Sequence, residues 1–150
     1  PVMKNIIVLI LLIFPCLCGK VLLPQEKVNG ESLYIHDRVR EYYILDNNSY
    51  IVSGPSIVSV YARLAVPKDV RGKHSFSITS ILSNSSGLIH EFSRKVDSSV
   101  SSSLHPMHRY TKSAKVEINI PNGEFILYLE NSSQIGNPIL TRVIQKKPKN

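Results

Sequence analysis

The sequence has no tryptophan, and its only two cysteines, Cys16 and Cys18, lie within the first 18 residues. The rest of the chain therefore has no disulfide and no thiolate chemistry. Zinc sites take three or four ligands, and the closest histidine pair, His105 and His108, supplies only two. We therefore expect no metal and no cofactor.

Motifs of the common enzyme classes are also missing. No Gly-x-Ser-x-Gly elbow marks a nucleophilic serine, and no glycine-rich loop marks a phosphate site. Carboxylates are scarce, with 11 Asp and Glu in 150 residues, and several of them sit beside expected turns, as solvated strand ends do. The sequence therefore predicts that the chain is not an enzyme.

Long hydrophobic runs are limited to one short stretch. Nine apolar residues, 6–14, follow Lys4 and precede a break at Pro15 and a group of small residues. This order predicts a secretory signal peptide over 1–19, since a membrane-spanning helix needs about 20 apolar residues. Two alternatives stay open: an uncleaved anchor, and lipidation at Cys16 or Cys18, which Pro15 and Leu17 disfavour. We expect an exported protein that is periplasmic, associated with the outer envelope, or secreted.

Basic residues outnumber acidic ones, and the formal net charge is +7. Lys and Arg are scattered along the chain without interleaved aromatics, which argues against nucleic acid as a partner. The partner we expect is an unknown envelope protein or a polysaccharide. Contact with a membrane is expected only through a lipid anchor or an uncleaved signal.

Most of the chain shows the alternation of half-buried β-strands. In the run 50–64, Val58, Val60, Ala62 and Leu64 form the expected core face, and Gly54-Pro55 interrupts the strand. About eight strands follow one another at short spacing without a convincing helix. The fold class predicted is all-β: an antiparallel β-sandwich, immunoglobulin-like or jelly-roll-like, with a barrel as the alternative.

Two hairpins are expected within this pattern. Strands 75–82 and 88–96 flank a turn at 84–87, and strands 115–120 and 124–130 flank Pro121-Asn122-Gly123. The domain organisation predicted is a signal peptide at 1–19, an irregular lead-in at 20–32, a β-sandwich at 33–145 and a basic tail at 146–150.

The serine-rich stretch 98–109 is the longest weakly structured segment and the best place for a site. Exposed aromatic residues on a sheet can stack on sugars or on a partner, and three tyrosines are expected on faces opposite the core. Filling the second side of a sandwich is the plainer interpretation of these tyrosines. The candidate binding residues are Tyr43, Tyr61, His105, His108, Arg109 and Tyr128.

A resemblance rests on four short motifs: Tyr-x-Val-x-Gly-Pro at 50–55, Ala-Arg-Leu at 62–64, Lys-Ser-Ala at 112–114, and Val-x-Ile-x-Ile-Pro-x-Gly at 116–123. In this order they resemble small uncharacterised secreted bacterial β-sandwich proteins, over about residues 42–145. The resemblance implies a sandwich fold in a bacterial envelope, and no activity.

Together these observations predict an exported, non-enzymatic β-sandwich of the bacterial cell envelope that acts as a binding or structural module. The alternative is a carbohydrate-binding or carbohydrate-active domain, such as a hydrolase.

Overall fold

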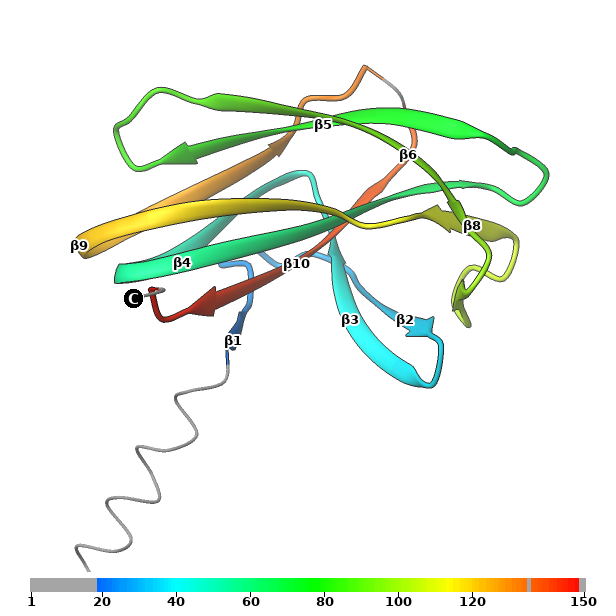
Figure 1. The fold of residues 1–150 in the computed structure, drawn as a ribbon, viewed down its shortest axis with the longest axis horizontal. Helices are drawn as coiled ribbons and strands as arrows, with labels where there is room; N and C mark the ends of the chain where they lie inside the picture. The colour runs from blue at the N-terminus through cyan, green and yellow to red at the C-terminus, as the bar shows by residue number, and fades with distance from the viewer. Residues whose placement is uncertain (1–18, 135, 149–150) are drawn as a thin grey trace, which may run out of the picture.

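The computed structural model describes residues 19–134 and 136–148, and these residues fold into ten β-strands (Figure 1). The strands are β1 (Lys20–Leu22), β2 (Gly30–Ile35), β3 (Arg38–Ile44), β4 (Asn47–Pro67), β5 (Lys73–Leu82), β6 (Leu88–Asp97), β7 (Val100–Ser102), β8 (His108–Thr111), β9 (Ala114–Asn131) and β10 (Ile139–Lys146). Within this described part the chain has no helix that could cross a membrane. The all-β prediction is confirmed.

Five of the strands close into a barrel. β4 pairs with β8, β8 with β6, β6 with β5, β5 with β9, and β9 returns to β4, and every pairing is antiparallel. Closure removes the free edges that an open sheet would expose. The predicted sandwich is therefore not what the structure has, and the barrel alternative describes these strands better. The sequence could not separate the two, because both require the same alternation along each strand.

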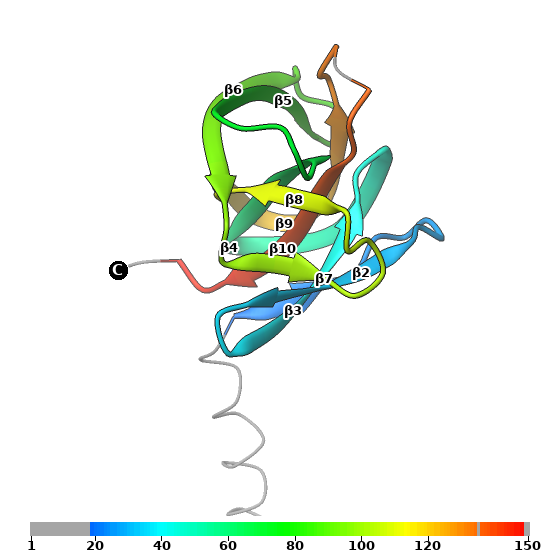
Figure 2. The ribbon, with the colours of Figure 1, turned by 90° about the vertical axis from the view of Figure 1, so that its right-hand side faces the viewer.

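The remaining strands branch from the barrel at β10, which pairs with β4 along 57–64. β3, β2 and β7 follow β10 in strand order. β3 pairs with residues 140–141 of β10, and β1 pairs with residues 143–145. Figure 2 shows this branch below the barrel, with β7 and β2 passing beneath β8. The branch gives the second face of β4 and β10 something to pack against.

β4 is the strand on which the fold is built, and its predicted core face is confirmed. Val58, Val60, Ala62 and Leu64 are all buried in the apolar core. The strand runs unbroken through Gly54-Pro55, where its register against β9 shifts. A Cβ on Gly54 would lie 1.8 Å from the carbonyl oxygen of Pro121, so this close approach of two backbones requires glycine.

The predicted hairpin at Pro121-Asn122-Gly123 is wrong. These residues lie inside β9, one strand of 18 residues that pairs with β4 from Glu130 back to Ala114. The turn-like residues instead sit where β9 faces the register shift at Gly54. Gly123 has a φ of +124°, which allows the strand to bend there without turning back. The other predicted hairpin, between β5 and β6, is confirmed.

Short strands occur where irregular chain was expected. β1 and the start of β2 lie in the predicted lead-in 20–32, and β7 and β8 lie within or at the end of the predicted loop 98–109. β1 finds its partner far away in the sequence on β10, β7 on β2 and β8 on β4, whereas β2 pairs with the adjacent β3 and β8 also pairs with the nearby β6. The predicted signal peptide over 1–19, with Cys16 and Cys18, lies outside the described residues except for Gly19.

A second cluster of buried residues lies between the branch and the outer face of β4, β8 and β10. It consists of Leu33, Tyr42, Ala65, Val100, Tyr110 and Leu140. Polar residues are buried beside it: the Arg63 guanidinium donates to the backbone oxygen of Thr111 at 3.0 Å, and the Tyr110 hydroxyl hydrogen-bonds the Glu31 carboxylate. We call these residues the second core, to distinguish them from the apolar core on the other face of β4.

Candidate functional site

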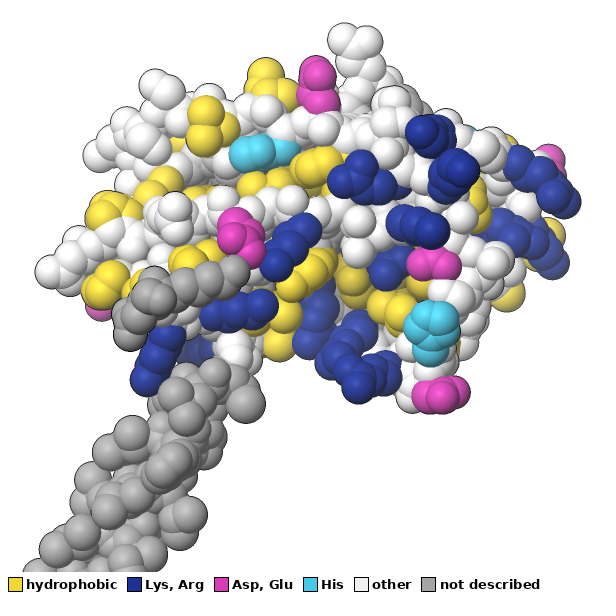
Figure 3. Space-filling model, viewed as in Figure 1, with side chains coloured by type: hydrophobic (Ala, Val, Ile, Leu, Met, Phe, Trp, Pro, Cys, Tyr) yellow, Lys and Arg dark blue, Asp and Glu magenta, His cyan; other side chains and the backbone are white. Residues whose placement is uncertain are grey.

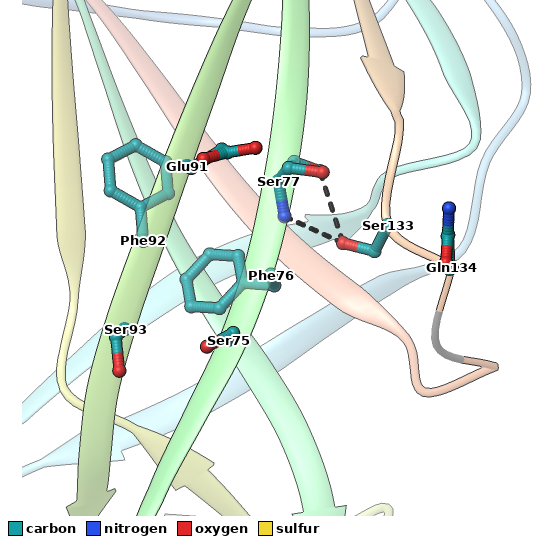
Figure 4. A pocket seen from close by; sticks show the side chains of 8 residues that line it. All are labelled: Ser75, Phe76, Ser77, Glu91, Phe92, Ser93, Ser133 and Gln134. Carbon is teal, nitrogen blue, oxygen red and sulfur yellow. Dashed lines mark hydrogen bonds between the residues drawn. The ribbon is translucent and has the colours of Figure 1, made fainter.

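The described surface contains a hollow of about 500 Å³ over β5 and β6, which we call the β5–β6 hollow. Its lining combines hydroxyl, amide and carboxylate groups with two aromatic rings (Figure 4). The lining residues are Ser75, Phe76, Ser77, Glu91, Phe92, Ser93, Ser133 and Gln134.

The hairpin register places these residues. Phe76 pairs with Phe92, and the next pair along the ladder is Ser77 with Glu91. Because partners across an antiparallel ladder point to the same side, the two rings share one face of the hairpin. Their centroids are 5.4 Å apart with a tilt of 44°, a favourable geometry for an aromatic pair. Phe76 is buried in the apolar core, whereas Phe92 is partly exposed.

The third side of the hollow comes from the segment after β9. The Ser133 hydroxyl accepts a hydrogen bond from the Ser77 backbone N–H at 2.7 Å and donates to the Ser77 backbone oxygen at 3.2 Å. The Ser132 hydroxyl donates to the Ser77 hydroxyl at 3.1 Å. Figure 4 shows Ser133 and Gln134 on the side of β5 opposite β6. These bonds hold Gln134 at the rim, with its side chain exposed.

The chemistry of the lining suits an uncharged polyhydroxyl ligand. The Gln134 amide donates and accepts, the serine hydroxyls do both, and the Glu91 carboxylate accepts two hydrogen bonds. Phe92 faces the opposite side of β6 from Glu91 and Ser93, and the Arg94 guanidinium lies 5.6 Å from its ring centroid. Glu91 is the one carboxylate among the described residues that line the hollow. Glycoside hydrolysis normally uses two, as acid and as base or nucleophile.

A titratable histidine lies just inside this wall. Burial lowers the pKa of His90, whose Nε2 atom is 2.8 Å from the Ser80 hydroxyl oxygen. The imidazole is therefore neutral at neutral pH, and the wall of the hollow gains no positive charge from it.

Three of the predicted site residues come together away from the hollow. The rings of His105 and His108 stack with centroids 5.1 Å apart, and His108 and Arg109 line an adjoining cleft at the end of β8. Among the described residues, no three His, Cys, Asp or Glu side chains are grouped to hold a metal ion.

The three predicted tyrosines are dispersed. Tyr128 is 40% exposed on β9, whereas Tyr61 is half-buried and packs against the second core, with Lys115 Nζ 5.6 Å from its ring centroid. Tyr43 lies opposite Thr141, which in turn lies opposite Ala62 of the apolar core. Its predicted position on the face opposite the core is therefore wrong. None of the three lines the β5–β6 hollow.

Residues of the hollow were missed because no motif marks them. The expected hairpin does carry Phe76, Phe92 and Glu91, but the expected turn does not give its register. Counting outward from the turn at 84–87 pairs Phe76 with Lys95, three residues away from the observed partner Phe92. The third side, Ser133 and Gln134, is 40 residues further along the chain, and no sequence pattern predicts that it lies beside this hairpin.

Comparison with known proteins gives only structural neighbours. No family model and no curated protein matches the chain. Similar solved structures include an exo-beta-1,3-galactanase from Phanerochaete chrysosporium with galactose, at 11% identity and a TM-score of 0.41, covering 85% of this chain and 29% of that one. Another is the catalytic domain of a GH87 alpha-1,3-glucanase in complex with tetrasaccharides, at 10% identity and a TM-score of 0.39, covering 88% of this chain and 28% of that one.

The chain thus spans less than a third of the length of either neighbour. Both neighbours are enzymes that act on glycans, and this finding contradicts the prediction that the chain is not an enzyme.

Proposed function

We propose that this chain is a carbohydrate-recognising β-domain of the cell envelope or the extracellular space, and that the β5–β6 hollow holds the sugar. The observation that carries the proposal is the lining of the hollow. The Glu91 carboxylate, the Gln134 amide and serine hydroxyls gather there, while the Phe92 ring points to the opposite face of β6. Sugar rings offer hydroxyls at their rim, and this lining complements them with donors and acceptors.

The hollow is supported from behind, which favours binding. On the other face of the hairpin Phe76 packs beside Phe92 against the apolar core, and Ser133 is tied to the β5 backbone by two hydrogen bonds. A lining held in place loses little conformational entropy when a ligand binds.

A glycan array followed by calorimetric titration of the best glycan tests the proposal. We expect Glu91→Gln to weaken binding about tenfold, because a hydrogen bond to a charged acceptor contributes about 1.5 kcal/mol or more. Gln134→Ala is expected to weaken it by a smaller factor. Glu124→Gln is the matched control, since Glu124 is exposed on β9 and does not line the hollow.

The same glycans are assayed for release of reducing sugar. Release that Glu91→Gln abolishes would make the domain a hydrolase with Glu91 as acid or base, and binding without release would make it a recognition module. Equal affinity of the unmodified chain, Glu91→Gln and Gln134→Ala for every bound glycan would refute a sugar site in the hollow.

A further inference from the structure

Four basic side chains gather beside the β5–β6 hollow, and we call their surroundings the basic cleft. Lys68 and Arg71 come from the loop between β4 and β5, Lys95 from β6 and Arg109 from β8. They line two adjoining hollows of about 250 Å³ and 710 Å³, and Lys68, Arg71 and Arg109 belong to both. Figure 3 shows Lys and Arg side chains gathered at the end of the molecule where β6 and β8 lie in Figure 1.

Barrel closure builds this cleft from three distant segments. β8 pairs Arg109 with Val66 and His108 with Pro67, which brings Arg109 next to the loop after β4. The loop begins with a turn in which the Val70 N–H donates to the Pro67 oxygen at 3.1 Å. Gly72 ends it with a φ of +89°, a conformation that favours glycine. The cations are therefore positioned by backbone pairing at both ends.

The positive charge of the cleft is not neutralised from within. Asp69 is the one acidic residue among the described residues that line it, and no described carboxylate forms an ion pair with Lys68, Arg71, Lys95 or Arg109. Gathering like charges at one place costs free energy, and an anionic ligand recovers it. Arginine adds geometry, because its guanidinium binds carboxylate, sulfate or phosphate oxygens through two parallel hydrogen bonds.

The basic cleft and the β5–β6 hollow are continuous along β6. Glu91, Ser93 and Lys95 alternate with less exposed residues, so the three exposed side chains share one face of the strand. Ser93 lines the hollow and Lys95 lines the cleft. Two residues of strand span roughly 7 Å, so a chain molecule lying along β6 would touch both.

We propose that the ligand is an anionic polysaccharide, with an uncharged sugar unit in the β5–β6 hollow and a sulfate or carboxylate group of a neighbouring unit in the basic cleft. The sugar part of this inference rests on the proposed function, whereas the anion part rests on the cleft alone. Lys68, Arg71, Lys95 and Arg109 are the anion-binding residues.

The charge pattern along β6 favours a glycan over nucleic acid. The hollow presents the Glu91 carboxylate, which repels a phosphate, and the cleft presents cations. A ligand that is uncharged at one end and anionic at the other fits this polarity. Nucleic acid carries a phosphate on every unit and does not.

Binding of the full chain to four polymers tests the inference: dextran, kappa-carrageenan, hyaluronate and a single-stranded DNA oligonucleotide. Kappa-carrageenan and hyaluronate both alternate an uncharged sugar with an anionic one, and they separate sulfate from carboxylate as the source of the anion. We expect at least one of these two to bind at least tenfold more tightly than dextran and than the DNA. We also expect this binding to weaken as salt is raised, because ions screen exposed charges.

The decisive variant is Arg71→Gln with Arg109→Gln, which is expected to weaken binding of the anionic glycan at least tenfold. The control is Lys20→Gln with Lys27→Gln, which removes the same charge from exposed positions outside the cleft and is expected to change binding less than twofold. Equal melting temperatures of the two double variants establish that both are folded.

Further outcomes separate the two proposals. Equal losses of glycan binding in the two double variants would show attraction to net charge alone and would overturn the inference. Tighter binding of the DNA than of the anionic glycans, or no binding of either anionic glycan, would also overturn it. Loss in Arg71→Gln/Arg109→Gln without any effect of Glu91→Gln or Gln134→Ala would support the anion site and refute the sugar site. Weaker glycan binding in Arg71→Gln/Arg109→Gln and also in Glu91→Gln or Gln134→Ala would support both the anion site and the sugar site.

Discussion

The two faces of β4 are buried in two different ways. One face contributes Val58, Val60 and Leu64 to the apolar core, where all three are fully buried. The other contributes Arg63, which is 6% exposed, to the second core. A strand that is buried on both faces thus has apolar contacts on one side and a charge that requires partners on the other.

The partners of Arg63 come from three strands. Its Nη1 atom lies 3.4 Å from Asp97 Oδ2 and donates to the Thr111 oxygen at 3.0 Å, while its Nε atom lies 3.4 Å from the Tyr42 hydroxyl. Apolar burial is non-directional and tolerates repacking, whereas a buried charge is stable only in one arrangement of donors and acceptors. The comparison therefore suggests that the apolar core supplies stability and the second core fixes how the branch docks on the barrel.

The largest expected effect tests the apolar core. Leu127 is fully buried on β9, and Leu127→Ala should lower the free energy of unfolding by about 3 kcal/mol, through lost burial and the cavity left behind. Ile126→Ala is the matched control on the same strand, because Ile126 is 37% exposed, and its loss should stay below about 1 kcal/mol. Urea unfolding measures both, and equal losses would mean that this face is not the main core.

A smaller loss is expected in the second core. Arg63→Met should cost about 2 kcal/mol, because Asp97 and the Thr111 oxygen both lose a donor while the volume is kept. Asp97 is 22% exposed at its side chain, so water compensates part of the loss. In the double variant Arg63→Met/Asp97→Asn the unpaired carboxylate is gone, and some stability should return. A double-mutant cycle from urea unfolding measures the coupling, and zero coupling would contradict the ion pair.

The smallest effect is a dependence of stability on pH. Burial raises the pKa of the Asp97 carboxyl, but hydrogen bonds from Ser99 and the Arg63 guanidinium outweigh it, so the net pKa lies below its ordinary value. A pKa that is lower in the folded state adds stability above the unfolded pKa of about 3.9, and this stability is lost as the pH falls through the folded value.

Urea midpoints measured between pH 6 and pH 3 should therefore fall more for the unmodified chain than for Asp97→Asn. The pKa of Glu26 is also lowered, chiefly by the hydrogen bond from the Ser49 hydroxyl, but this contribution is common to both proteins and cancels in the difference. Parallel profiles would show that Asp97 has the same pKa in the folded and unfolded states.

Local patterns predicted the parts of the fold that depend on neighbouring residues. The core face of β4 follows from alternation, and the β5–β6 hairpin follows from a turn flanked by two strands. The same reasoning failed at Pro121-Asn122-Gly123, because the pairing of β9 with β4 over its whole length outweighs a local turn preference. Whether strands close into a barrel or stack as a sandwich depends on which edges meet, and alternation carries no information about that.

The candidate site also has a part that local sequence patterns predicted and a part that they did not. The hairpin that carries Phe92 and Glu91 was predicted without its register, and His108 and Arg109 were singled out as loop residues. Their meeting with Lys68, Arg71 and Lys95 was not visible, since these residues come from three segments that barrel closure brings together. The sequence by itself determined the strand content, the apolar face of β4 and the excess of positive charge. Only the tertiary structure decided where that charge is concentrated, because long-range strand pairing sets which loops become neighbours.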